Sequence, residues 1–284
     1  MPRLDGRTVV VTGANSGIGL AAARNFATQG AHVVLAVRDP ERGEKAASTV
    51  EGDREVRRLD LADLASVRSF AEGWDGDIDI LVNNAGVMAV PFGHTADGFE
   101  MQFGTNHLGH FALTGLLLPH VKDRVVTVSS VAHRTGHIQL DDLNWQRRKY
   151  QRWSAYGQSK LANLLFTLEL QRRLAAAGSD VRAMAAHPGY ANTNLQSHTG
   201  NPFQNALMWL ANRTIAQSEE RGALPTFFAA TEDVPGGSYV GPNGIGESRG
   251  NPTLVGRSRA AQDTQMAAAL WERSEALTGV TYPV

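Results

Sequence analysis

The sequence predicts an α/β fold in which one parallel sheet carries helices on both of its faces. Short runs rich in β-branched residues alternate with longer helix-compatible stretches over the first two thirds of the chain, and polar or glycine-rich turns follow these runs. This alternation is typical of doubly wound sheets. The chain of 284 residues has no internal repeat, no low-complexity tract and no linker that would divide it, so we expect a single domain over residues 1–284.

The composition argues against several classes of protein. Hydrophobic residues make up 42% of the chain and charged residues 19%, as in ordinary globular proteins. A formal net charge of -1 gives no bulk attraction to nucleic acid or to an anionic membrane. The absence of cysteine excludes disulfides, thiolate metal sites and a cysteine nucleophile. Without a signal peptide or a membrane-spanning stretch in the sequence, we expect a cytoplasmic protein with no membrane or nucleic-acid partner.

The first expected strand, Thr8 to Val11, runs through a glycine-rich turn into a helix over residues 17–29. The turn reads TGANSGIG, and its glycines allow a tight bend while the helix N-terminus offers free N–H groups to a phosphate. Strand, turn and helix together are typical of a Rossmann-type dinucleotide site, although a purely structural turn is the alternative. The expected phosphate contacts are Gly13, Asn15, Ser16, Gly17, Ile18 and Gly19.

The second expected strand, His32 to Val37, is followed by Arg38. In a dinucleotide fold this strand end lies close to the adenosine ribose, where an acidic residue would accept bonds from the ribose hydroxyls. A guanidinium instead suits a 2′-phosphate, so Arg38 favours NADP(H) over NAD(H) as the cofactor. The alternative is a solvated arginine that pairs with Asp39.

The third and fourth expected strands, over residues 55–59 and 78–82, end in two further polar turns. Asp60 and Leu61 follow the third, where a carboxylate could accept a bond from the adenine amino group. The fourth leads into NNAG, from which we expect Asn83, Ala85 and Gly86 to contact the cofactor. Because ligands of such sheets bind at the carboxyl ends of the strands, all of these turns should line one crevice. Helices are expected over 41–50, 64–74 and 99–118.

The fifth strand, over residues 124–128, brings Ser129 and Ser130 to the same edge, and a helix from about residue 155 to 177 follows it. Tyr156 and Lys160 are four residues apart and therefore share one face of that helix. An ammonium beside a phenol favours the phenolate, so we expect Lys160 to lower the pKa of Tyr156. The alternative is an ordinary tyrosine and lysine on the solvated face of an amphipathic helix. A sixth strand, over 180–186, leads into a turn from which Pro188, Gly189 and Thr193 are further cofactor contacts.

Taken together, these motifs resemble those of the short-chain dehydrogenase/reductase family. TGANSGIG, NNAG, VSS, YGQSK and HPG stand in the family's order, and the resemblance extends from residue 7 to about residue 240. It implies that Ser130 orients a substrate carbonyl, that Tyr156 exchanges a proton and that Lys160 binds the nicotinamide ribose. It also implies that Asn106 positions a proton-relay water. The choice of Ser130 over Ser129 comes from the family pattern, and Ser129 is then an ordinary strand-end hydroxyl.

The segment before Tyr156 points to one branch of that family. The interval from Ser130 to Tyr156 is 26 residues, about twice that of many members, and it begins with Val131-Ala132-His133. This pattern resembles the branch of retinol dehydrogenases and protochlorophyllide reductases. Retinol dehydrogenases often carry a membrane anchor and protochlorophyllide reductases use a cysteine, and we expect neither here, so neither substrate follows from the resemblance.

Several stretches allow more than one interpretation. Residues 145–153 mix aromatic and basic side chains, which indicates a solvated loop over the site rather than a nucleic-acid surface. His107 and His110 have no acidic residue at ligand spacing, so we expect no metal site. Residues 190–230 could form a mobile substrate lid or a pair of core helices. We expect 241–252 to be loop and 266–277 to be a last helix, a candidate contact between subunits of a homo-oligomer.

The sequence therefore predicts an enzyme that transfers a hydride between NADP(H) and the carbonyl or alcohol of a small, fairly apolar substrate. Because hydride reaches the carbonyl carbon, a proton must reach its oxygen, and Tyr156 is the expected acid or base. One alternative is NADPH-dependent reduction of a carbon–carbon double bond in the same crevice. Another is a dinucleotide-sensing binding protein without turnover, which the set of Ser130, Tyr156, Lys160 and Asn106 disfavours.

Overall fold

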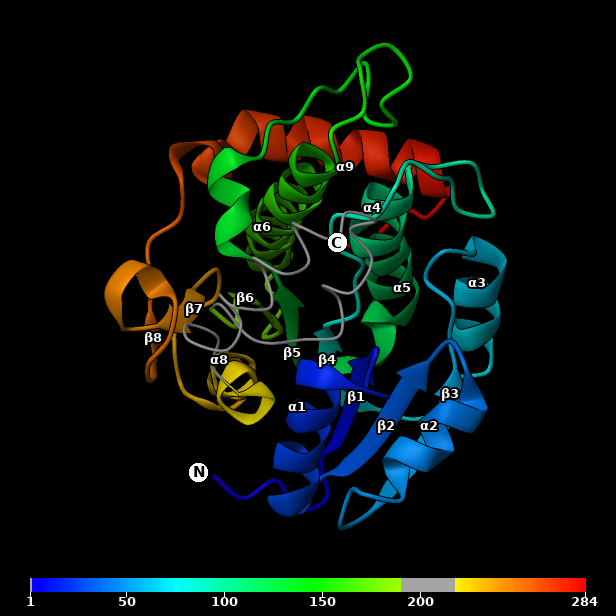
Figure 1. Ribbon diagram of the computed structural model, residues 1–284. Helices are drawn as coiled ribbons and strands as arrows, with labels where there is room; N and C mark the ends of the chain where they lie inside the picture. Colours follow the sequence, from blue (N-terminus) through cyan, green and yellow to red (C-terminus); the bar gives the residue numbers. More distant parts are fainter. Residues whose placement is uncertain (1, 190–217) are drawn as a thin grey trace, which may run out of the picture.

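The protein is built on one eight-stranded sheet (Figure 1), described here from a computed structural model for residues 2–189 and 218–284. The strand order is β3-β2-β1-β4-β5-β6-β7-β8, and only β8 runs antiparallel to its neighbour. The predicted doubly wound α/β fold is thereby confirmed. The strands are β1 (Thr8–Thr12), β2 (His32–Val37), β3 (Arg54–Arg58), β4 (Ile78–Asn83), β5 (Val121–Val128), β6 (Arg182–Ala186), β7 (Tyr239–Pro242) and β8 (Pro252–Leu254).

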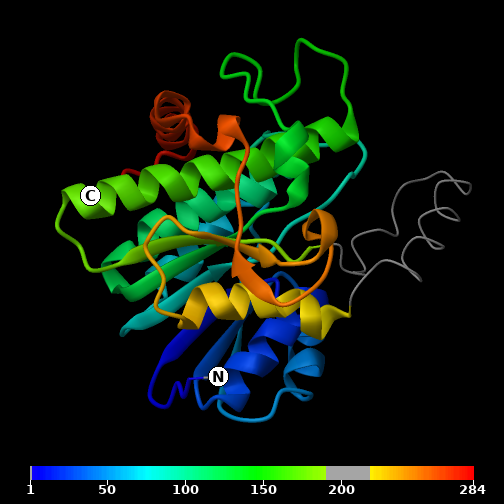
Figure 2. The same ribbon diagram turned by 90° about the vertical axis from the view of Figure 1, so that its left-hand side faces the viewer.

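Helices cover both faces of the sheet (Figure 2). The α1 and α8 helices lie together on one face, whereas α3, α5 and α6 cover the other and α9 lies outside α5 and α6. The helices are α1 (Gly17–Thr28), α2 (Pro40–Ala47), α3 (Leu64–Glu72), α4 (Met101–Phe103), α5 (Gly109–Leu117), α6 (Arg152–Ala176), α8 (Glu219–Thr231) and α9 (Thr264–Thr278).

Successive side chains of β1 point to opposite faces of the sheet, and the helices on each face bury them. Val9 and Val11 are fully buried in the core under α1 and α8, and Val10 is fully buried in the opposite core under α5 and α6. A strand buried on both faces is apolar at every position, which is why the β-branched runs were readable in the sequence. In the first core, the rings of Phe26 on α1 and Phe227 on α8 lie 5.2 Å apart.

Two predictions about the second half need correction or restriction. The stretch 241–252 was expected to be loop, but its ends belong to strands β7 and β8, which are joined by a turn in which Asn243 N donates to Asn251 O at 2.9 Å. Pairing with the rest of the sheet determines these short strands, and their glycine and prolines conceal them in the sequence. Of the stretch 190–230, residues 190–217 lie outside the described residues, and from Glu219 onward the chain is α8, packed in the core.

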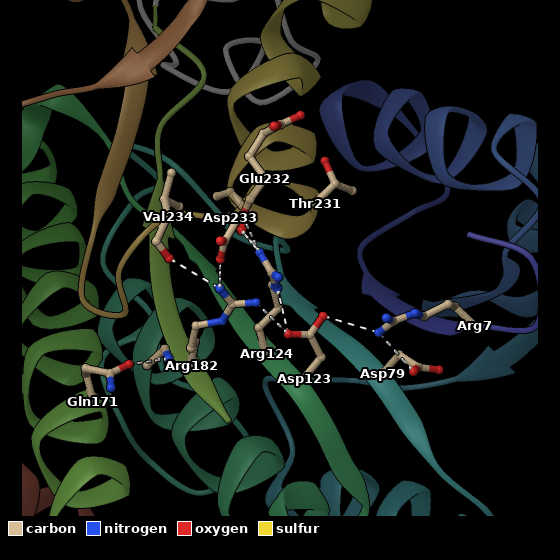
Figure 3. Close-up of polar contacts among 12 residues, drawn as sticks. Arg7, Asp79, Asp123, Arg124, Gln171, Arg182, Thr231, Glu232, Asp233 and Val234 are labelled. Carbon is tan, nitrogen blue, oxygen red and sulfur yellow. Dashed lines mark hydrogen bonds and ion pairs between the residues drawn. The ribbon is translucent and has the colours of Figure 1, made fainter. Parts of the chain in front are cut away.

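An ion-pair network holds α8 to the amino ends of the strands (Figure 3). The carboxylate of Asp123 accepts bonds from Arg124 and Arg182, each at 3.1 Å. Arg124 is buried, and its Nη1 also donates to the carbonyls of Ala229 (3.1 Å) and Glu232 (2.9 Å) at the C-terminal end of α8. Bonds to the last carbonyls satisfy acceptors that a helix cannot satisfy by itself. The carboxyl ends of the strands, where ligands bind in such folds, lie at the opposite edge.

Candidate functional site

The turns after successive strands line a single cavity of about 610 Å³. It lies where the strand order reverses between β1 and β4, the usual ligand position in an open parallel sheet. The predicted residues that line it are Gly13, Asn15, Ser16, Gly17, Ile18, Gly19, Arg38, Asp60, Leu61, Ala85, Gly86, Tyr156, Lys160 and Pro188. Residues not predicted as contacts also line it, namely Ala36, Asp39, Arg42, Leu59, Ala62, Asn84, Val87, Met101, Thr105, Val128 and Ser129.

The glycine turn packs directly against the NNAG stretch. Gly13 has a φ of 67°, and a Cβ there would come within 2.9 Å of the Cα of Ala85. A Cβ on Gly19 would come within 2.5 Å of the carbonyl oxygen of Gly13. Ser16 precedes α1 in an extended conformation, and its side chain does not cap the helix. The first turn of α1 therefore offers its N–H groups to an anion in the cavity.

Two arginines line the cavity beside the end of β2. Arg38 is exposed and makes no hydrogen bond or ion pair with any residue that the structure describes. The expected alternative partner, Asp39, instead caps α2 by accepting from Arg42 N at 3.2 Å and lies 3.5 Å from the Arg42 guanidinium. Arg42 was missed in the sequence, although its position four residues after Arg38 at the start of a helix would have indicated it. Both guanidinium groups can therefore meet an anion at this strand end.

The asparagines of NNAG face opposite ways. The side chain of Asn83 is fully buried and donates to the hydroxyl of Thr114 at 2.8 Å, away from the cavity. Asn84 lines the cavity instead, and its amide donates to the carbonyl of Thr12 at 2.8 Å. Adjacent residues at a strand end point to opposite sides, so Asn84 rather than the predicted Asn83 lines the cavity.

The turn after β6 lies beside the cavity without entering it at Gly189. Pro188 lines the cavity, and Gly189, with a φ of 69°, donates its N–H to Nδ1 of His187 at 3.2 Å. The His187 ring is buried, and its Nε2 lies 3.1 Å from a carboxylate oxygen of Glu247. His187 thus supports the backbone of this turn. Thr193 lies outside the described residues.

Tyr156 and Lys160 line the cavity, and Ser130 lies beside Tyr156 without being one of the lining residues. Nζ of Lys160 donates to the carbonyl of Val128 at 3.0 Å and lies 5.8 Å from the centre of the Tyr156 ring. The Ser130 hydroxyl accepts from Ala132 N at 3.2 Å and is close enough to the Tyr156 phenol to lower its pKa. Ser129 borders the cavity, but its hydroxyl donates to the carbonyl of Lys160 at 2.8 Å, a structural role.

Burial dominates the ionisation of this pair. It raises the pKa of Tyr156 to about 12, and the Ser130 hydroxyl beside it only partly opposes that effect. Burial also lowers the pKa of Lys160 to about 8. The expected lowering of the Tyr156 pKa by Lys160 is therefore not what this geometry produces. At neutral pH Tyr156 keeps its proton and can donate it.

Asn106 stands behind the cavity in a π turn, Gly104–Leu108, between α4 and α5. Its side-chain oxygen accepts from Val87 N at 2.8 Å, while its amide donates to Val87 O and to the Ser159 hydroxyl, both at 2.9 Å. The side chain of Asn106 thus fixes the chain just after NNAG. A Cβ on Gly86 would lie 3.0 Å from the Asn106 side-chain oxygen and 3.6 Å from Nζ of Lys160, so this backbone passes close to both.

The long segment before α6 folds on itself. Its buried Trp145 lies under the Arg148 guanidinium, whose carbon is 3.7 Å from the ring centre. The Tyr150 hydroxyl donates to the buried Glu100 carboxylate at 3.0 Å, which ties the segment to α4. The rings of Trp145 and Tyr150 lie 5.5 Å apart and pack edge to face. Trp153 is 48% exposed, and its ring meets the Tyr156 ring edge-on at 6.3 Å.

The two histidines of the π-turn region are hydrogen-bonded core residues. Nε2 of His107 lies 2.9 Å from the Ser274 hydroxyl, and His110 bonds to Thr12 and Asn106. Burial lowers the pKa of His107 to about 3 and that of His110 to about 4, so both are neutral. In residues 2–189 and 218–284, no group of three or more His, Asp or Glu side chains could hold a metal ion. None of the helices in these ranges has the length and apolarity to cross a bilayer.

Comparisons with known proteins agree with the motifs. A family model described as short chain dehydrogenase matches residues 7–202. Retinol dehydrogenase 13 from Homo sapiens is 43% identical over 296 aligned residues, which cover 99% of this chain and 87% of the human protein. A crystal structure of an uncharacterised protein from Mycobacterium paratuberculosis is 56% identical, with a TM-score of 0.88 over 100% of this chain and 97% of that one. The RhlG/NADP active-site complex from Pseudomonas aeruginosa is 25% identical, with a TM-score of 0.67 over 84% of this chain and 94% of that one.

Proposed function

The chain belongs to the short-chain dehydrogenase family, in the branch of the retinol dehydrogenases, and on this premise we propose that it is an NADP(H)-dependent enzyme with Tyr156 as its acid and base. As a member it is an oxidoreductase of CH–OH or C=O groups, and its family binds nicotinamide dinucleotides. The observation that most supports the proposal is that Tyr156 and Lys160, with Ser130 beside Tyr156, line the same cavity as the glycine turn.

The residues present fit a dinucleotide along the whole cavity. The close approach of Gly13 and Gly19 to neighbouring backbone leaves no room for a Cβ, and the N–H groups of the first turn of α1 suit a pyrophosphate. Arg38 and Arg42 together suit the extra phosphate of NADP(H), and the RhlG complex contains NADP. Lys160 would hold the ribose next to the nicotinamide.

The proton chemistry follows from this chain's own side chains. The reduced nicotinamide, when bound, would supply the hydride. Tyr156 is protonated at neutral pH and would donate to the carbonyl oxygen, toward which the Ser130 hydroxyl would also donate. Met101, which lines the cavity, and Trp153, which contacts the Tyr156 ring, would provide apolar contacts for a fairly apolar substrate.

The test is Tyr156→Phe, measured by oxidation of NADPH with a panel of aldehydes, ketones and quinones. Loss of the general acid should lower turnover by about two to four decades while NADPH binding, followed by nucleotide fluorescence, stays close to that of the unmodified protein. Tyr282→Phe is the matched control, because Tyr282 is a buried tyrosine whose hydroxyl donates to Phe111 O at 2.7 Å, outside the residues that line the cavity. Unchanged turnover in Tyr156→Phe would refute the mechanism.

The same experiment separates the alternatives. Reduction of an α,β-unsaturated ketone to the saturated ketone would assign the enzyme to carbon–carbon double bonds, whereas an allylic alcohol as the product supports the proposal. NADPH binding without turnover of any compound in the panel would indicate a dinucleotide sensor.

A further inference from the structure

A buried chain of hydrogen bonds runs through His110 and joins two walls of the cavity. One ring nitrogen, Nε2, lies 2.9 Å from the hydroxyl of Thr12 at the start of the glycine turn. The other, Nδ1, lies 3.0 Å from the carbonyl oxygen of Asn106 in the π turn. Thr12 and Asn106 are fully buried and His110 is 1% exposed, so water does not compete for these bonds.

The direction of each bond can be assigned from the partners. A carbonyl can only accept, so Nδ1 of His110 carries the proton and donates to Asn106. The Thr12 hydroxyl already accepts from Asn84 N and Ala85 N, both at 2.9 Å, which occupies its two lone pairs. Its own proton has two possible acceptors, the carbonyl oxygen of Val82 at 3.4 Å and Nε2 of His110 at 2.9 Å, and we assign it to Nε2 because that atom is nearer. The pKa of His110, lowered to about 4 chiefly by burial, is consistent with this neutral tautomer.

The two ends of the chain hold opposite ends of one cavity-lining stretch. Thr12 fixes the backbone N–H groups of Asn84 and Ala85, while Asn106 fixes both backbone polar groups of Val87. The backbone between them, at Gly86, passes close to Nζ of Lys160. His110 bonds to both Thr12 and Asn106, so it helps to set the distance between the two residues that hold the ends of residues 84–87.

We propose that His110 is a positioning residue, which acts through Thr12 and Asn106 to hold residues 84–87 in register with Lys160. The inference rests on the proposed function, because its consequence is the placement of the nicotinamide end of the cofactor. The adenosine end, at Arg38 and Arg42, lies outside this chain of hydrogen bonds.

Three substitutions test the two hydrogen bonds of the His110 ring separately and together. His110→Phe keeps an aromatic ring but removes both bonds. His110→Asn offers an amide N–H near the position of Nδ1 and can keep the bond to Asn106, whereas His110→Gln reaches further and can keep an acceptor for Thr12. His107→Phe is the matched control, because His107 is equally buried in the same region but bonds to Ser274.

The measurements are the Kd values of NADPH and of 2′,5′-ADP, which lacks the nicotinamide half, together with kcat and hydrogen exchange of residues 84–87. For His110→Phe we expect the NADPH Kd to rise about tenfold, kcat to fall about tenfold or more and exchange to accelerate. The 2′,5′-ADP Kd should stay within about twofold. His110→Asn and His110→Gln should fall between His110→Phe and the unmodified protein.

Two results would overturn the inference. One is a folded His110→Phe protein with unchanged NADPH affinity and exchange. The other is the same losses in His107→Phe, which would show a general effect of core substitution. If His110→Phe does not fold, unchanged exchange at residues 84–87 in both His110→Asn and His110→Gln would also overturn it. A protein without turnover would refute the proposed function, while the exchange measurement would still test the role of His110.

Discussion

Replacing Lys160 by methionine should stabilise the protein at neutral pH, although it should abolish the proposed role of Lys160. Lys160 is 4% exposed, and burial lowers its pKa from the ordinary value of 10.5 to about 8. A change of one pKa unit corresponds to about 1.4 kcal/mol. Burial of the protonated lysine therefore lowers the free energy of unfolding by about 3 kcal/mol. Below pH 8, both the folded and the unfolded protein keep this proton, and the full cost is present.

The sign of the pH dependence follows from the same pKa values. Between pH 8 and about 10.5 the unfolded chain binds more protons at Lys160 than the folded protein does, so the contribution of Lys160 to stability rises with pH. The difference in the free energy of unfolding between Lys160→Met and the unmodified protein should therefore be about 3 kcal/mol at pH 7 and should shrink toward pH 10. Other titrating groups contribute equally to the pH dependence of both proteins, so they cancel in this difference and only the contribution of Lys160 remains.

The assay is urea denaturation of both proteins without cofactor at pH 7, 8, 9 and 10, followed by tryptophan fluorescence. Lys122→Met is the control. Lys122 is an exposed lysine whose Nζ lies 3.1 Å from the carboxylate of Asp77, and exposed pairs of this kind contribute at most about 1 kcal/mol. A Lys160→Met protein that is less stable than the unmodified one at pH 7, or a difference that does not change with pH, would refute the reasoning.

Two further predictions concern the arginines. Arg38→Asp should shift the ratio of kcat/KM for NADPH over NADH by about one to three decades toward NADH, and Arg42→Ala should lower it by less; a variant that keeps its NADPH preference would contradict the role of Arg38. Arg124→Met should lower the free energy of unfolding, measured by urea denaturation, by about 3 kcal/mol, because it leaves two carbonyls at the end of α8 without their donor. The exposed guanidinium of Arg7 lies 3.3 Å from Asp123, and Arg7→Met should cost less than about 1 kcal/mol in the same assay. Equal losses in the two variants would contradict this account of the network.

The parts of the fold that the sequence predicted are those in which local pattern and tertiary environment agree. The strand over residues 32–37 was predicted with its observed bounds, because every position after His32 is apolar and buried. The glycine turn was predicted because its conformation requires glycine at Gly13. In contrast, β7 and β8 contain four and three residues and depend on pairing with β6 and with each other, which no local pattern records.

The site was predictable in its residue types but less so in their orientation. Asn83 and Asn84 could not be distinguished, because only the register of β4 decides which of them faces the cavity. His110 was considered only as a metal ligand, since its hydrogen-bond partners are 98 residues away in the glycine turn and four residues away in the π turn. A spacing of 98 residues carries no signal in a single sequence.

The pKa of Tyr156 shows why proximity of charge alone was an insufficient guide. The sequence placed an ammonium beside a phenol, and from that pair alone the phenolate should be favoured. The fold buries both groups, however, and burial disfavours the charged form of each, so it raises the pKa of Tyr156 to about 12 and lowers that of Lys160 to about 8. At neutral pH the pair is therefore a protonated phenol and a largely protonated amine. In the proposed mechanism this state would let Tyr156 give a proton to a carbonyl oxygen, whereas in the oxidation of an alcohol Tyr156 would first have to lose that proton.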